Sequence, residues 1–277
     1  MAFLHQFLQA LAGERACLVS VESTQGSTPR ERGAWMAVFA HQALGTVGGG
    51  HVEFAAIAHA RKFLANAGDS APETHRYALG PSLGQCCGGV MHLRFECVSS
   101  ADVPALRQRL GQALRPLALF GGGHVGHALV HVLAPLPFAL TWIDSRDGIF
   151  PDPEPEGVVC ETSDPVQGAV PGLLAGTLVL IMSFSHAEDL DVVAACLERQ
   201  RTRADLPFIG LIGSDTKWAT FRSRLRSRGF SDAELAHITC PIGVAGIAGK
   251  QPEVIAVGVA AQLLQLPAPA GEGNSEA

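Results

Sequence analysis

The chain has 277 residues, a length that fits two domains of ordinary size. Hydrophobic residues make up 47% of it and charged residues only 17%, which allows a large core and excludes extensive disorder. The net charge of −6 argues against a nucleic-acid partner, because no overall positive field attracts a polyanion. Seven scattered cysteines favour reduced thiols in the cytoplasm over a disulfide framework.

The first part of the chain predicts an α+β domain over residues 1–113. Its longest predicted helix, at 51–65, rests on the helical spacing of Val52, Ala55, Ala56, His59 and Phe63. Turn-rich and glycine-rich segments separate the other elements. We expect strands at 15–21, 34–40, 75–79 and 90–98, and a second helix at 105–114.

From residue 117 onward, strands alternate with helices, which is typical of a doubly wound parallel sheet with helices on both faces. We therefore expect a Rossmann-like domain over 114–266, followed by a frayed tail over 267–277. The uncharged stretch 166–187 is rejected as a membrane span, because prolines and glycines interrupt it. The expected strands are 117–120, 138–144, 158–161, 177–182 and 207–212, and the expected helices are 124–133, 188–199, 215–228 and 252–264.

A Gly-x-Gly-x-x-Gly motif, Gly121, Gly123 and Gly126, lies between the first of these strands and its helix. The pattern predicts a tight turn at Gly121, close approach of a phosphate at Gly123 with a positive φ, and close helix packing at Gly126. Asp144 ends the next strand and is expected to accept a hydrogen bond from a ribose hydroxyl. We expect Gly123→Val to disturb ligand binding or folding more than Gly122→Ala. The fold also occurs as a scaffold, so nucleotide binding stays open.

Histidines recur on the helix after this motif. His124, His127 and His131 share one face, but no glutamate accompanies them as in a zinc-protease motif, and the sequence suggests no third ligand. Capping and packing roles are therefore favoured over a metal site.

Ser183, Ser185, His186 and Asp189 resemble the members of a hydrolytic triad. A capping box formed by Ser185 and Glu188 explains the pattern better, because no Gly-x-Ser-x-Gly turn surrounds either serine. His186 still follows a buried parallel strand, where ligands bind in this fold class.

A basic run begins at Lys217 and continues through the arginines at 222, 224, 226 and 228. Most runs of this kind are exposed to solvent, so we expect a solvated helix face.

Cys86 and Cys87 lie between glycines in an expected loop, and this setting is unusual for structural cysteines. Backbone N–H groups of such a loop can hold an anion and lower a thiol pKa. The sequence therefore indicates that at least one of the two thiols is functional, without deciding which.

Motifs along nearly the whole chain resemble the xanthine dehydrogenase accessory proteins of the XdhC type. The most specific of them is Gln85-Cys86-Cys87-Gly88-Gly89. The others are Gly26-Ser27-Thr28-Pro29-Arg30, Gly48-Gly49-Gly50-His51-Val52-Glu53, Gly121 to Gly126, Asp144-Ser145-Arg146, Ser185-His186, Gly210 to Ser214 with Lys217, and Cys240-Pro241-Ile242-Gly243.

This resemblance implies a cytoplasmic chaperone that carries the molybdenum cofactor without turning over a substrate. It implies cofactor contacts by Gln85, Arg30, Glu53 and the glycine loops, and by Cys86 and Cys87, whose thiols are both candidate molybdenum ligands. The further expected cofactor contacts are His124, Asp144, Ser185 and His186. The implied partners are an apo-xanthine dehydrogenase or related molybdenum hydroxylase, a cysteine desulfurase and a second copy of the chain. The alternative is an NAD(P)-dependent oxidoreductase that uses the Gly121–Gly126 loop, although no acid–base pair accompanies that loop in the sequence.

Overall fold

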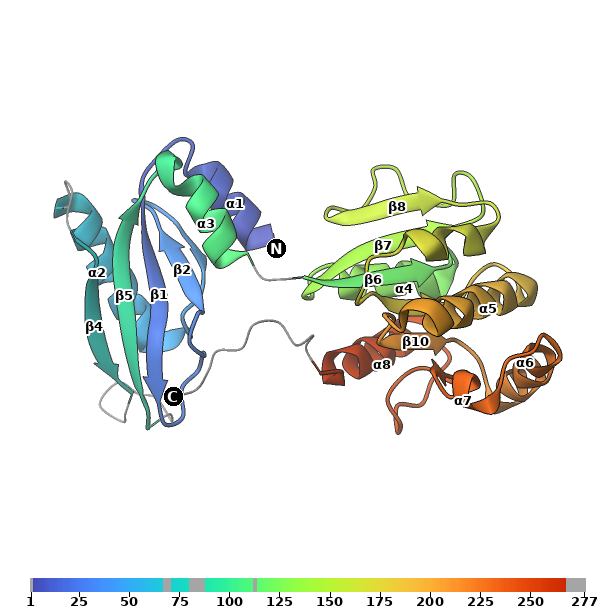
Figure 1. Ribbon diagram of the computed structural model, residues 1–277. Coiled ribbons are helices and arrows are strands. Elements are labelled where there is room, and N and C mark those ends of the chain that lie inside the picture. Colours follow the sequence, from blue (N-terminus) through green and yellow to red (C-terminus); the bar gives the residue numbers. More distant parts are fainter. Residues whose placement is uncertain (1, 67–70, 80–87, 112–113, 268–277) are drawn as a thin grey trace. The chain divides into compact units, whose positions relative to one another are not determined.

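The computed structural model describes residues 2–66, 71–79, 88–111 and 114–267, which belong to two compact units, Met1–Gly111 and Gln112–Ala277 (Figure 1). The first unit contains an antiparallel sheet and the second a parallel one, so the predicted α+β unit followed by a Rossmann-like unit is confirmed. No helix in the described ranges combines the length and apolar character that crossing a bilayer requires.

The first unit has a five-stranded sheet in the order β3-β2-β1-β5-β4, so that β4 is an edge strand. Its elements are α1 (Ala2–Ala10), β1 (Ala16–Gln25), β2 (Trp35–Val38), β3 (Ala43–Gly45), α2 (Gly50–Asn66), β4 (Glu73–Ala78), β5 (Val90–Val98), the short 3-10 helix η2 (Ser100–Asp102) and α3 (Val103–Leu110).

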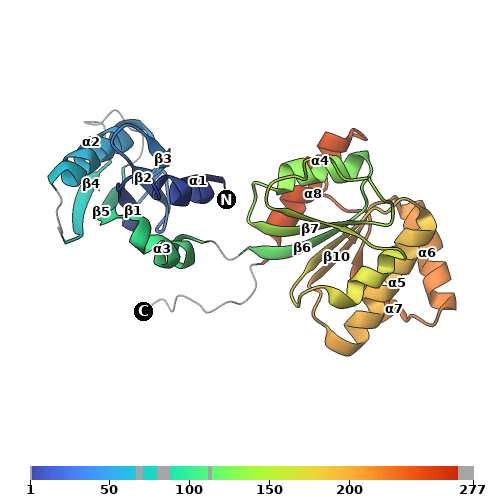
Figure 2. The ribbon, with the colours of Figure 1, turned by 90° about the horizontal axis from the view of Figure 1, so that it is seen from above.

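Both faces of this sheet are covered, and the central strand β1 shows why. Its side chains alternate between faces, as they do in any strand. Cys17 and Val19 pack in one cluster with residues of α2, whereas Ala16 and Leu18 pack in another with residues of α1 and α3. Figure 2 shows α2 on the opposite side of the sheet from α1 and α3.

Several elements of this unit differ from those expected. The predicted strand 34–40 is a hairpin, because β2 ends at Val38 and β3 pairs back onto it. The helix expected over 105–114 is α3, which ends at Leu110 before the extended Gly111. Helix α1 was not predicted, although its Phe7 and Leu8 are buried in the core.

The second unit has a six-stranded sheet in the order β11-β10-β9-β6-β7-β8, with all neighbours parallel. Its elements are β6 (Arg115–Phe120), α4 (His124–Leu133), β7 (Phe138–Asp144), β8 (Val158–Thr162), the 3-10 helix η3 (Val166–Gly172), β9 (Leu178–Ile181), α5 (His186–Arg203), β10 (Phe208–Leu211), α6 (Asp215–Ser227), α7 (Asp232–Leu235), β11 (Ile238–Thr239) and α8 (Pro252–Gln265).

Strand β6 is central because its uncharged run Leu117–Phe120 is buried on both faces. Leu117 and Leu119 pack with α4 and α8, whereas Ala118 and Phe120 pack with η3, α5 and α6. From β6 the chain adds β7 and β8 on one side of the sheet, and it then returns to add β9, β10 and β11 on the other side. The loops after Phe120 and Ile181 therefore lie at the switch point between β6 and β9, where ligands bind in such sheets.

Candidate functional site

Three glycine-containing loops of the first unit lie against one another at one end of its sheet. A Cβ at Gly89 would be 2.5 Å from the carbonyl oxygens of Gln25 and Ser27, and a Cβ at Gly48 would be 2.5 Å from Cγ of Pro29. The segment after β1, the loop before α2 and the start of β5 therefore meet, although the sequence separates them widely. These are three of the motifs on which the family resemblance rests.

Glu53, in the first turn of α2, holds the loop before that helix. Its Oε2 accepts hydrogen bonds from Thr46 Oγ1 at 2.5 Å and from the N–H groups of Val47 and Gly49 at 3.1 Å. This carboxylate thus positions the glycine loop, and its Oε2 is committed within the protein. Gly49 has open space where a Cβ would be, and Gly50 is exposed.

Arg30 is an exposed cation beside the same loops. Thr28 Oγ1 donates to the Arg30 carbonyl at 3.1 Å, which fixes the backbone there. Its guanidinium forms no hydrogen bond or ion pair with the parts of the chain that the structure describes. Gln85, Cys86 and Cys87 lie outside the described residues, but Gly88 and Gly89, which follow them directly, are part of this loop cluster.

In the second unit, close packing leaves no room for a side chain at two glycines of the Gly-x-Gly-x-x-Gly motif. Gly121 has a φ of +126°, and a Cβ there would lie 2.0 Å from the Met182 carbonyl oxygen. A Cβ at Gly126 would lie 2.1 Å from the Gly121 carbonyl oxygen, which also accepts a hydrogen bond from Trp142 Nε1 at 2.9 Å. No side chain fits at either position without moving the backbone.

The two middle glycines differ from the expectation. Gly123 has a φ of −78°, which suits any residue, and no atom lies within 4 Å of its Cβ position. At Gly122 a Cβ would meet Ile149 Cγ1 at 2.6 Å and Asp144 Oδ2 at 3.1 Å. The prediction of a positive φ at Gly123 is therefore wrong, and it is Gly122 that the fold requires. The open space at Gly123 remains available to a ligand.

Asp144 is 1% exposed, and both of its oxygens have partners within the protein. Oδ1 accepts from Arg146 N and Nε at 3.0 and 2.8 Å, and Oδ2 accepts from Gly122 N at 2.5 Å and Arg146 Nη2 at 2.9 Å. Burial by itself would raise the pKa of Asp144, but these hydrogen bonds outweigh it and hold the pKa below its ordinary value. In this structure the carboxylate of Asp144 holds the glycine loop through Gly122 N, and its contact with a ribose hydroxyl stays a prediction.

The serine and histidine after β9 have structural partners. Ser185 is the N-cap of α5, and its Oγ accepts from Glu188 N at 3.2 Å, which confirms the capping role. The reciprocal bond of the predicted capping box differs, because Glu188 Oε2 accepts from Phe184 N at 3.1 Å. His186 is exposed and its ring centroid is 6.2 Å from that of Phe221. Asp189 accepts hydrogen bonds from Ser183 N and Lys217 Nζ and not from His186, so these residues do not form a hydrolytic triad.

A buried ion pair, which no sequence pattern predicted, joins Asp189 to Lys217. Lys217 Nζ donates to Asp189 Oδ2 at 2.7 Å and to the Ile212 carbonyl at 2.8 Å, while Asp189 Oδ1 accepts from Ser183 N at 2.7 Å. The expectation that Lys217 belongs to a solvated basic face is wrong, because its side chain is only 12% exposed. The pair ties together the loops after β9 and β10.

The histidines of α4 and the thiol of Cys240 are the further candidates for a metal ligand or a nucleophile. His127 packs edge-on against Trp142, with centroids 4.8 Å apart, and neither His124 nor His131 joins a group of three metal-ligating side chains among the described residues. Burial raises the pKa of Cys240 to about 11, an effect that the nearby Lys217 only partly opposes. That thiol is therefore protonated at neutral pH.

A cavity of about 250 Å³ lies beside the end of β10, between Ile212, Gly213 and the segment 242–250. Sites that enclose a drug-sized ligand are larger, at ~300–1,000 Å³. This cavity fits only part of a ligand of cofactor size.

Comparisons with known proteins cover both units. A family model described as the XdhC and CoxI family matches residues 10–78, and a model described as the XdhC Rossmann domain matches residues 117–263, more than half of the chain.

Similar proteins were found both by sequence and by structure. The chain is 25% identical over 254 residues to the uncharacterized protein YqeB of Escherichia coli K12, which covers 90% of this chain and 43% of that protein. The chain thus spans less than half the length of this relative. A crystal structure of a xanthine dehydrogenase from Bacillus halodurans matches with a TM-score of 0.76 and 20% identity, over 96% of this chain and 95% of that one. At this level of identity the likeness shows the fold.

Proposed function

Since the chain belongs to the XdhC and CoxI family, we propose that it is an accessory protein in the maturation of xanthine dehydrogenase or a related molybdenum hydroxylase. In this role it binds the molybdenum cofactor, protects it during sulfuration, and supports its insertion into the apo-enzyme in the cytoplasm. It carries the cofactor and does not use it in turnover. A cysteine desulfurase and a second copy of the chain are the further proposed partners.

The observation that carries this proposal is the meeting of three glycine loops in the first unit. Gly88 and Gly89 follow Cys86-Cys87 in the sequence, and Gly89 lies against Gln25 and Ser27 at the start of the loop that carries Arg30. A guanidinium without a partner in the described chain suits a phosphate, and a thiol is a soft ligand that suits molybdenum. The residues present therefore fit a pterin cofactor that contains both groups.

Individual residues have different roles in this proposal. Arg30 would contact the phosphate directly, whereas Glu53 is a positioning residue, because its Oε2 holds the backbone of Val47 and Gly49. A nucleotide in the second unit is a separate proposal. The open space at Gly123 supports it, whereas the commitment of Asp144 to Arg146 argues against a ribose contact there.

Replacing both thiols tests the proposal. The protein is produced with its partner dehydrogenase in a host that makes the cofactor, and molybdenum is measured per dehydrogenase subunit. We expect Cys86→Ser/Cys87→Ser to reduce molybdenum loading to the level found without the accessory protein, because serine keeps the shape but removes the soft ligand.

Cys97→Ser is the matched control. Cys97 lies near the end of β5 remote from the loop cluster, and burial raises its pKa, so its thiol is protonated. We expect normal loading with this variant. Full loading and full activity with the double variant would contradict the thiol role, and circular dichroism confirms that each variant is folded.

A further inference from the structure

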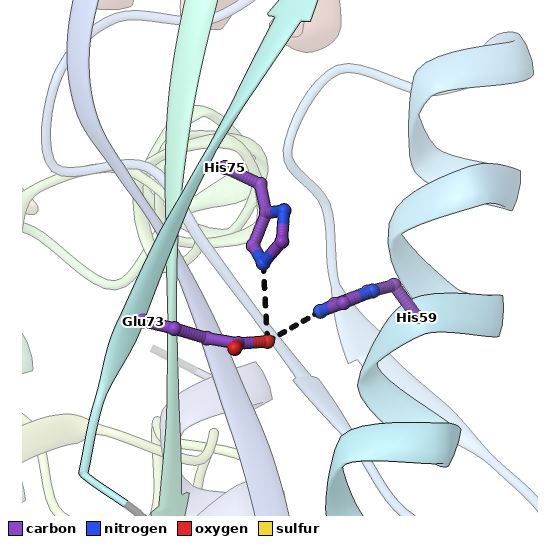
Figure 3. A group of neighbouring side chains, drawn as sticks. All are labelled: His59, Glu73 and His75. Atoms are coloured by element: carbon purple, nitrogen blue, oxygen red, sulfur yellow. Dashed lines mark hydrogen bonds and ion pairs between the residues drawn. The ribbon is translucent and has the colours of Figure 1, made fainter.

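Three metal-ligating side chains meet in the first unit, away from the glycine loops. His59 lies on the face of α2 that packs on the sheet, and Glu73 and His75 lie on the edge strand β4 (Figure 3). Glu73 Oε1 is 2.5 Å from His59 Nε2 and 3.1 Å from His75 Nε2. Among the described residues this is the one group of three that could hold a metal ion.

The fold fixes these side chains in place. Glu73 and His75 are two residues apart on a strand, so both point to the face covered by α2. Beneath them Phe95, paired with Glu73 across the strands, packs edge-on against both imidazoles, with centroids 4.7 Å from His59 and 5.7 Å from His75. The two imidazole rings are themselves 4.3 Å apart.

We propose that His59, Glu73 and His75 bind one divalent transition-metal ion of the zinc class. The three ligand atoms all lie within 4.8 Å of one another. Around a tetrahedral zinc with bonds of about 2.0–2.1 Å, ligand atoms are about 3.3 Å apart. The distances from Glu73 Oε1 to the two imidazole nitrogens, 2.5 and 3.1 Å, and the limit of 4.8 Å for all three pairs bracket that spacing.

The donor set determines the class of ion. Two imidazole nitrogens and one carboxylate oxygen suit zinc, cobalt, nickel or iron(II), whereas calcium and magnesium prefer oxygen ligands alone. The same carboxylate oxygen, Glu73 Oε1, faces Nε2 of both imidazoles, so the three donor atoms converge on one point.

Three protein ligands leave one tetrahedral position open, which is the pattern of zinc sites that exchange a ligand. The side chains of His59, Glu73 and His75 are 32%, 39% and 43% exposed, so water or a small anion can reach that position. His59 is about 13 Å along the helix from Gly50, and Glu73 begins β4 at the end opposite Ala78. This site is therefore distinct from the loop cluster assigned to the molybdenum cofactor.

Cobalt(II) is the probe for the test, because it occupies zinc sites and absorbs visible light when tetrahedrally bound. The full-length protein is stripped with a chelator and titrated with Co²⁺. We expect saturation at one equivalent, displacement by one equivalent of Zn²⁺, and a shift of the absorption when azide is added. No saturable binding would overturn the proposal, and an azide-insensitive spectrum would overturn the open position.

Substitution of a proposed metal-binding residue tests where the ion binds. Losing even an outer-shell partner of a metal ligand costs ~10–100-fold in metal affinity, so His75→Asn should weaken Co²⁺ binding by more than about 100-fold. The matched control is His92→Asn, since His92 lies on the neighbouring strand β5 and contacts Ser23 Oγ at 3.1 Å outside the group. Control and wild type should bind equally.

Equal binding by wild type and His75→Asn would place the ion elsewhere, for example on the thiols, and would overturn the proposal. Circular dichroism of the metal-free proteins checks folding. Should His75→Asn not fold, Glu73→Gln carries the same test, because it is nearly isosteric and removes the charge.

Discussion

At the scale of single residues, the carboxylate of Asp144 organises the second unit. It is buried, and Arg146 supplies three of its four hydrogen bonds. The guanidinium also lies over the ring of Phe184, 4.5 Å from its centroid. Removing this cation would leave a buried carboxylate with only backbone donors.

We expect Arg146→Gln to lower the free energy of unfolding at pH 7 by an amount near the lower end of the ~3–5 kcal/mol seen when a buried pair loses one partner, because Arg146 is itself 32% exposed. Urea unfolding measures the change. Arg222→Gln is the control: its ion pair with Asp232 is exposed, and such pairs contribute only ~0–1 kcal/mol. Equal losses in both variants would contradict the role of Asp144.

The difference between Arg146→Gln and wild type should depend on pH. The folded pKa of Asp144 lies below its unfolded value of about 3.9, so its contribution is complete above pH ~4 and is lost as the pH falls through the folded pKa. In the variant, the guanidinium no longer opposes the burial that raises the pKa of Asp144. The destabilisation by Arg146→Gln should therefore be largest at neutral pH and shrink as the pH falls through the folded pKa of the variant toward that of wild type.

At the scale of elements, the turn from β6 into α4 contains one glycine, Gly122, that packing requires and another, Gly123, that faces open space. We expect Gly122→Ala to destabilise the protein by about 1–3 kcal/mol, because the new Cβ overlaps with Ile149. Gly123→Ser should be neutral or stabilise by a few tenths of a kcal/mol, because the extended residue before α4 is the N-cap and serine is favoured there. Urea unfolding compares the two variants, and a larger loss in Gly123→Ser would reverse this assignment.

Sequence patterns predicted the elements best where a single environment governs a whole segment. The helix 124–133 and the strands 138–144 and 90–98 have the predicted bounds, because continuous apolar or alternating runs define them. The hairpin of β2 and β3 and the early start of β4 at Glu73 were not predicted, since strand pairing decides them. An acid and a histidine two residues apart on a strand, with another histidine on an inward helix face, is the signal that could have revealed the metal-ligating group.

The candidate site was only partly predictable for the same reason. Sequence motifs identified the glycine loops, but their meeting at Gly89 and Gly48 depends on which strands are neighbours. The role of Gly122 depends on Ile149, whose position in a later loop no spacing rule gives. Likewise, Lys217 begins a basic run, and only the packing of α5 beside α6 pairs it with Asp189.

At the scale of the whole molecule, each hydrophobic cluster is confined to one unit. We therefore expect residues 112–277 to fold when produced alone, with a helical circular dichroism spectrum and a cooperative thermal transition. A fragment of residues 138–277 is the control. It lacks β6, which pairs with both β7 and β9, and should not fold. Absence of a cooperative transition in the longer fragment would contradict the independence of its core.

Strand β4 also bears on how the protein avoids aggregation. An edge strand offers unpaired backbone groups to which a strand of another chain can add. Here Glu73 and His75 point to one face and Arg76 to the other, so an apolar strand that paired with this edge would have to desolvate charged and polar groups on both faces. The side chains assigned to a metal ion thus also protect the open edge of the sheet.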